Sequence, residues 1–87
     1  MKHLLVTNDY PPKVGGIQSY LWELWRRLDP ADVTVLTTPY DGADAFDATA
    51  PHRIDRTREP VLIPNPMLVG KIEALAREVD ARLLVLD

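Results

Sequence analysis

The chain has 87 residues, about half of a typical domain of ~100–200 residues, and its 46% hydrophobic and 26% charged residues are typical of a folding, globular sequence. Ten basic and thirteen acidic residues give a net charge of -3, without the basic field that nucleic-acid binding needs, so no nucleic-acid partner is expected. The absence of cysteine excludes disulfides, thiolate metal sites and cysteine nucleophiles. Apolar runs are far shorter than the ~20 residues that span a bilayer, and a cytoplasmic location is expected.

The first elements follow a strand, loop, helix order. Lys2 to Thr7 is short and apolar at its centre, which predicts a strand buried on both faces of a parallel sheet. Two prolines and two glycines then predict a loop over residues 8–16. From Ile17 the apolar residues recur at helical spacing, and Pro30 is expected to end this helix.

A second strand and a polar segment follow. Val33 to Leu36 is apolar and β-branched, which predicts a strand that completes a βαβ unit with a right-handed crossover. Residues 38–51 are interpreted as an exposed loop, or as a segment ordered by a partner. Its aspartates, Asp41, Asp44 and Asp47, are interpreted as solvated loop charge, because the segment lacks the glycine position and final glutamate of an EF-hand.

The last elements complete an α/β pattern. A third strand is predicted at Arg53 to Arg56, and a helix at Pro66 to Val79 with Asn65 as its N-cap. A fourth strand is predicted at Arg82 to Leu86. The order β-α-β-β-α-β predicts a partial Rossmann-like, doubly wound parallel sheet. Because no helix follows the last strand to cover it, residues 1–87 are expected to be part of a larger domain with an open sheet edge.

The junction between the first strand and the first helix is the first candidate site. Open α/β sheets bind ligands at the carboxyl ends of their strands, and Gly15 and Gly16 leave the amides of a helix start accessible to a phosphate. The alternative is a turn that needs permissive backbone angles. Neither the GxGxxG fingerprint nor the GxxxxGK[ST] loop occurs, which argues against NAD enzymes and P-loop ATPases.

The same segment carries a family resemblance. The string Thr7-Asn8-Asp9-Tyr10-Pro11-Pro12-Lys13-Val14-Gly15-Gly16-Ile17-Gln18-Ser19-Tyr20-Leu21, with Glu23-Leu24 and Arg27-Leu28, resembles the start of a family 4 glycosyltransferase. It is most similar to bacterial phosphatidylinositol mannosyltransferases and related mannosyltransferases, mainly through Gln18 and Ser19. The resemblance implies the GT-B fold, in which two Rossmann-like domains face each other across a cleft. The chain would form the first half of the N-terminal, acceptor-side domain, without the C-terminal nucleotide-sugar domain.

The resemblance also implies site residues. Gly16, with Gly15, would bind the donor diphosphate, while Asp9, Tyr10 and Gln18 would border the acceptor. The catalytic histidine and the groups that hold the nucleotide would come from elsewhere in the protein, so no catalytic residue, no metal and no cofactor are assigned to this chain. Asp9 could instead be a general base, but a lone carboxylate at a helix start is more often a turn or capping residue.

Two histidines and one stripe of the first predicted helix lie outside this set of site residues. His3 and His52 are assigned ordinary structural or surface roles. Around the first predicted helix, Trp22 falls off the apolar face, beside Gln18, Trp25 and Arg26. This stripe could touch a lipid acceptor, the bilayer interface or the rest of the protein, or Trp22 could simply pack under a neighbouring loop.

The leading hypothesis is therefore the N-terminal part of a retaining glycosyltransferase. It would transfer a hexose, such as mannose from GDP-mannose, to a lipid or glycolipid acceptor at the inner face of the membrane, and the isolated 87-residue piece would be inactive. The alternative from another class is a small non-catalytic α/β module that acts with a partner chain. A response-regulator or flavodoxin-like domain is disfavoured, because neither an acidic pocket nor a phosphate loop is evident.

Overall fold

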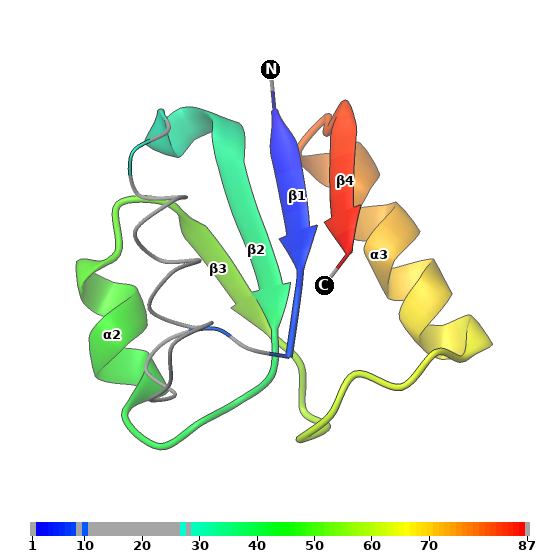
Figure 1. Cartoon of the computed structure of the whole chain (residues 1–87), viewed down its shortest axis with the longest axis horizontal. Coiled ribbons are helices and arrows are strands. Elements are labelled where there is room, and N and C mark those ends of the chain that lie inside the picture. Colours follow the sequence, from blue (N-terminus) through cyan, green and yellow to red (C-terminus); the bar gives the residue numbers. More distant parts are fainter. Residues whose placement is uncertain (1, 9, 11–26, 28, 87) are drawn as a thin grey trace.

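In the computed structural model, residues 2–8, 10, 27 and 29–86 are described (Figure 1). They form four strands. The strand at Arg53–Arg56 has the predicted bounds, and the bounds of the other three differ from the predicted ones by at most one residue at each end. The elements are β1 (His3–Val6), η1 (Pro30–Asp32), β2 (Val33–Thr37), α2 (Ala43–Thr49), β3 (Arg53–Arg56), α3 (Pro66–Glu78) and β4 (Leu83–Leu86). The helix predicted from Ile17 lies outside the described residues, and Pro30, its expected end, begins the 3-10 turn η1.

The strands form one parallel sheet in the order β3-β2-β1-β4. Leu5 of β1 is paired with Val35 of β2 on one side and with Val85 of β4 on the other. The chain therefore adds β2 and β3 on one side of β1 and then crosses to its other side to form β4. This reversal beside β1 is the point at which doubly wound sheets bind their ligands, and the predicted α/β class is confirmed.

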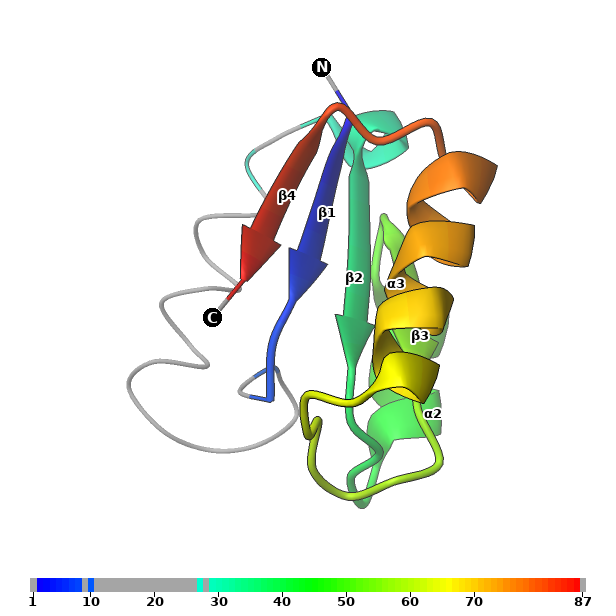
Figure 2. The ribbon, with the colours of Figure 1, turned by 90° about the vertical axis from the view of Figure 1, so that its right-hand side faces the viewer.

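Alternate strand residues build two apolar layers, one on each face of the sheet. On one face, Leu5, Val33 and Val35 pack with Tyr10, and Phe46 of α2 joins them. On the other face, the core consists of Leu4, Val6, Leu36 and Leu75, together with further residues of α3 and its flanking loops. Figure 2 shows α3 running along one side of the sheet. The two helices thus contribute to opposite faces.

Helix α3 begins where the sequence predicts. Asn65 has an extended backbone, and its Oδ1 accepts a hydrogen bond of 2.8 Å from the amide of Leu68, while Pro66 occupies the first helical position. Leu75 is buried and Ile72 is half-buried, so the predicted apolar stripe faces the sheet. The interpretation of this helix as a core-packing element is therefore confirmed.

The interpretation of residues 38–51 as a loop is wrong, because Ala43–Thr49 forms helix α2. Gly42 starts it in the left-handed region, at φ 82°, where glycine is favoured. Phe46 anchors the helix on the core. Asp47 is not solvated loop charge, since it forms an ion pair with Arg56 of β3. A short helix with one large apolar side chain presents too few periodic positions to be recognised.

Candidate functional site

The carboxyl edge of the sheet positions the candidate site. Beyond the ends of the strands, the amide of Thr7 still donates to the carbonyl of Leu36 (3.1 Å), and the amide of Thr57 donates to that of Thr37 (2.8 Å). The backbone is therefore fixed up to the residues where the chain leaves the sheet. Asn8 and Tyr10 follow β1 at this edge, beside the strand reversal.

Of the predicted site residues, only Tyr10 belongs to the described part of the chain. Asp9, Gln18 and the two glycines Gly15 and Gly16 lie outside it, and their roles stay predictions. The structure consequently shows the strand ends from which these residues continue, and it shows the surroundings of one predicted acceptor residue.

The side chain of Tyr10 lies in the core, with 1% of its surface exposed. Its hydroxyl oxygen lies 2.7 Å from Nε2 of His52, which is also buried. Its ring meets those of Phe46 and His52 edge to face, at centroid distances of 6.3 Å and 6.0 Å. Burial raises the pKa of Tyr10, so the phenol keeps its proton. In this conformation the Tyr10 side chain faces the protein, and any contact with an acceptor would come from the adjoining backbone and residues.

His52 is a buried structural residue, as expected from the sequence. Its contact with Tyr10 is not predicted from the sequence. His52 lies in the bend between α2 and β3, and burial lowers its pKa below the ordinary value of 6.5, against the opposing effect of Asp47. A neutral imidazole has one donor and one acceptor nitrogen. Nε2 of His52 can therefore accept a hydrogen bond from the Tyr10 hydroxyl in one tautomer and donate one to it in the other.

Arg56 joins β3 to α2 and to the end of β2. Its Nε and Nη2 donate to the two carboxylate oxygens of Asp47, each at 2.9 Å, and its Nη1 donates to the carbonyl of Thr38 at 2.8 Å. Arg56 is largely buried, whereas the ion pairs of Arg53 with Asp55 and Glu78 are exposed. Bidentate, partly buried pairs of this kind fix geometry better than exposed pairs do.

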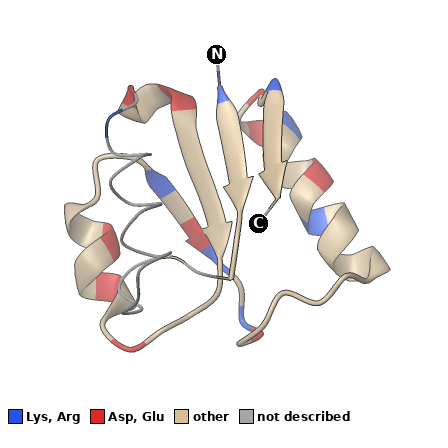
Figure 3. Ribbon diagram, viewed as in Figure 1, with Lys and Arg blue, Asp and Glu red and all other residues tan. Residues whose placement is uncertain are grey.

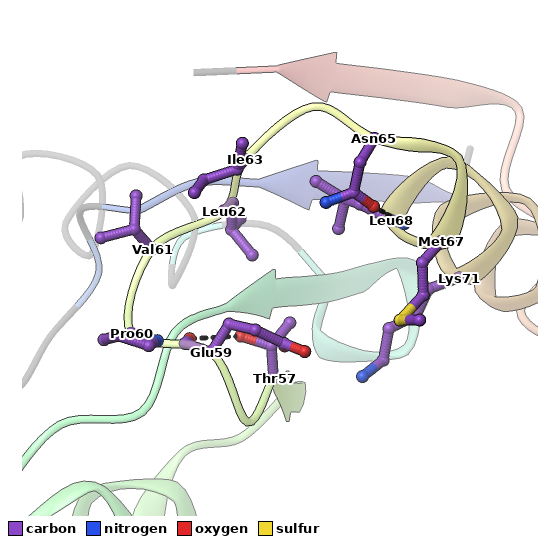
Figure 4. Close-up of a pocket in the computed structure, with 10 residues that line it drawn as sticks. All are labelled: Thr57, Glu59, Pro60, Val61, Leu62, Ile63, Asn65, Met67, Leu68 and Lys71. Carbon is purple, nitrogen blue, oxygen red and sulfur yellow. Dashed lines mark hydrogen bonds between the residues drawn. The ribbon is translucent and has the colours of Figure 1, made fainter.

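Asn8 links β1 to the segment between β3 and α3. Its Oδ1 accepts a hydrogen bond of 2.7 Å from the amide of Leu62. Next to this contact lies an open pocket of about 370 Å³ (Figure 4). Its lining is mostly apolar, with one acidic and one basic side chain, and consists of Thr57, Glu59, Pro60, Val61, Leu62, Ile63, Asn65, Met67, Leu68 and Lys71.

Charge is distributed unevenly over the described residues, because residues 29–52 contain five aspartates and no lysine or arginine. Figure 3 shows acidic and basic residues interspersed along β3 and α3. In the described ranges no group of three or more His, Asp or Glu side chains could hold a metal ion. None of the helices in these ranges is long and apolar enough to cross a bilayer.

Three residues were not singled out from the sequence as functional candidates, namely Asn8 and Arg56 at this edge and His52 at the amino end of β3. Asn8 directly follows the first predicted strand, which is a usable signal for a ligand-edge residue. The partners of His52 and Arg56 are 42 and 9 residues away in the chain, and no local pattern indicates such pairs.

Comparison with known proteins gives a consistent set of relatives, although no family model matches the chain. It is 42% identical over 83 residues to a GDP-mannose-dependent alpha-(1-6)-phosphatidylinositol monomannoside mannosyltransferase of Mycobacterium tuberculosis, and 36% over 81 residues to one of Mycolicibacterium smegmatis. It is 35% identical over 79 residues to a GDP-mannose-dependent monoacylated alpha-(1-6)-phosphatidylinositol monomannoside mannosyltransferase of Corynebacterium glutamicum. Each match covers 88% of this chain and 21% or 22% of the relative, so the chain spans about a fifth of their length. The chain is thus a relative of bacterial phosphatidylinositol mannoside mannosyltransferases, which confirms the resemblance carried by residues 7–28.

Proposed function

We propose that the chain forms part of the N-terminal, acceptor-side domain of a retaining GT-B glycosyltransferase of family 4. The complete protein would transfer mannose from GDP-mannose to a phosphatidylinositol-derived glycolipid. The observation that carries this proposal is the identity of 35% to 42% with mannosyltransferases whose names specify GDP-mannose and phosphatidylinositol monomannoside. The parallel sheet supports it, because its strand reversal directs the end of β1 toward a ligand crevice.

Within this proposal, the segment after β1 serves both substrates. The amide of Gly16, beside Gly15, would meet the donor diphosphate at the start of the predicted helix, where unpaired amides favour an anion. Asp9 and Gln18 would border the acceptor. Tyr10 would act at the acceptor side by holding the segment, since its own side chain is buried.

The 87-residue piece alone is expected to be inactive. The diphosphate leaves with a negative charge that must be stabilised in the transition state. One backbone amide and a helix start supply only part of that stabilisation, and the proposal assigns the remaining cationic groups to the C-terminal domain. Enzyme activity is therefore expected only from the complete polypeptide that carries this chain, acting at the surface of a membrane that contains its acceptor.

A donor panel tests the proposal. The complete protein is incubated with vesicles containing phosphatidylinositol monomannoside and with GDP-mannose, GDP-glucose or UDP-glucose, and the lipid products are identified by mass spectrometry. We expect a product heavier by one hexose with GDP-mannose, with retained anomeric configuration by NMR. Transfer from a uridine donor in preference to GDP-mannose, or no transfer from any donor, would contradict it.

A further inference from the structure

We infer that His52 is a positioning residue, which holds Tyr10 and thereby fixes the start of the segment proposed to border the acceptor. The inference rests on the proposed function for the identity of the substrate, but its structural part does not. Tyr10 and His52 are 42 residues apart in sequence and meet inside the core. Through this contact, the bend before β3 is joined to the chain after β1.

The contact itself is specific in distance and orientation. The hydroxyl of Tyr10 lies 2.7 Å from Nε2 of His52, and the two rings are nearly perpendicular, at 87°. Both side chains are more than nine-tenths buried. A hydrogen bond removed from water is directional, and losing one partner removes that constraint from the other. The Tyr10 ring is therefore held in one place and one orientation.

The segment that contains His52 is held by an ion pair. Asp47 of α2 and Arg56 of β3 lie on either side of His52 in sequence, and their bidentate ion pair closes the bend between them. Arg56, the last residue of β3, also donates to the carbonyl of Thr38, which joins the carboxyl ends of β3 and β2. A group that positions a substrate segment acts best when its own support is fixed in this way.

The protonation states of both groups follow from their surroundings. Tyr10 keeps its proton in the core, and His52 is kept neutral there, since burial shifts the pKa of each group toward its uncharged form. In this neutral pair, either the phenol donates to Nε2 of an imidazole protonated at Nδ1, or an imidazole protonated at Nε2 donates to the phenol oxygen. A replacement for His52 must be neutral and present a hydrogen-bonding atom at the position of Nε2, which glutamine can do and leucine cannot.

Variants of the complete protein test the inference. In steady-state assays with GDP-mannose and phosphatidylinositol monomannoside vesicles, His52→Leu and Tyr10→Phe should each raise the KM for the acceptor by about 3- to 10-fold, the loss expected for one hydrogen bond. The kcat and the KM for GDP-mannose should stay close to wild type. His52→Gln should restore the acceptor KM, and the double variant His52→Leu/Tyr10→Phe should be no worse than either single variant.

A matched control separates positioning from general destabilisation. Leu75→Val removes one buried methylene from the opposite face of the sheet, so it should lower the melting temperature without changing the acceptor KM. If His52→Leu behaves as Leu75→Val does, or if the effects of His52→Leu and Tyr10→Phe add in the double variant, the inference is overturned.

Amide hydrogen exchange provides a readout that does not depend on activity. His52→Leu should increase exchange in peptides covering residues 8–18 under native conditions, whereas His52→Gln and Leu75→Val should not. Unchanged exchange in His52→Leu would overturn the inference even if the enzyme transfers mannose. Increased exchange in a protein that fails to use GDP-mannose would support the tether while refuting the proposed function.

Discussion

The hydroxyl groups of the threonines at the carboxyl edge of the sheet are buried, yet they are satisfied to different degrees. Thr57 Oγ1 donates to the carbonyl of Glu59 at 2.9 Å. Thr37 Oγ1 and Thr38 Oγ1 are buried and form no hydrogen bond with any described residue. A buried polar group without a partner costs free energy, whereas the same group with a partner is close to neutral or favourable. The edge therefore contains both a stabilising and a destabilising hydroxyl.

Replacing these threonines by valine should have opposite effects. Thr38→Val keeps the shape of the side chain and removes an unsatisfied hydroxyl, so the free energy of unfolding should rise by about 1 kcal/mol. Thr57→Val, the matched control, removes a hydrogen-bonded hydroxyl and should lower it by about 1 kcal/mol. Urea unfolding of the two variants measures both changes. A loss of stability in Thr38→Val would indicate that its hydroxyl has a partner.

His52 should make the stability of the fold depend on pH. The groups that act on it or on its partner are Tyr10, Asp47 and Arg56. Burial lowers the pKa of His52 in the folded state below 6.5, so the unfolded chain binds a proton more readily. Its contribution to stability is then complete above the unfolded pKa and is lost as the pH falls from that value through the lower pKa of the folded state.

The test compares wild type with His52→Gln, which cannot titrate in this range. Between about pH 7.5 and about pH 5.5, wild type should lose more free energy of unfolding than His52→Gln does. Other titrating groups cancel in the comparison, because both proteins contain them. Parallel pH curves for the two proteins would show that His52 is not kept neutral by the fold.

At the scale of elements, the sequence predicts what has a local signal. β3 at Arg53–Arg56 and the Asn65 cap of α3 agree with the prediction, because strand patterning and capping chemistry involve residues close in sequence. Helix α2 is not predicted, because Gly42, Pro39 and the aspartates are typical of loops and only Ala43 and Phe46 mark its buried side. The contact of Tyr10 with His52 was beyond prediction, since it depends on how distant elements pack.

Two glycines offer an element-scale test of backbone conformation. Gly70 lies inside α3, and a Cβ built there meets no atom within 4 Å, so Gly70→Ala should raise the free energy of unfolding by about 0.5–1 kcal/mol. Gly42 has equal space but a φ of 82°, so Gly42→Ala should destabilise α2. Thermal unfolding of the Gly70→Ala and Gly42→Ala variants measures both changes in stability. Equal effects of the two substitutions would contradict the backbone assignment.

At the scale of the whole molecule, the sheet has one edge at β3 and another at β4. Leu84 and Leu86 of β4 are 45% and 67% exposed. Strands buried on both faces are typical of doubly wound sheets, and apolar side chains left exposed on such strands mark surfaces that another element covers. Under the proposed function, the rest of the N-terminal domain would cover these leucines; the chain spans about a fifth of the length of its relatives.

The most direct test of the account is whether the glycine pair after β1 binds the donor diphosphate. Gly16→Val and the control Gly70→Ala are made in the complete protein, and the KM for GDP-mannose is measured with phosphatidylinositol monomannoside vesicles. The account predicts a KM raised by at least about 10-fold for Gly16→Val, because a side chain there blocks approach of the phosphate, and an unchanged KM for Gly70→Ala. Wild-type donor KM and kcat in a folded Gly16→Val protein would contradict the account.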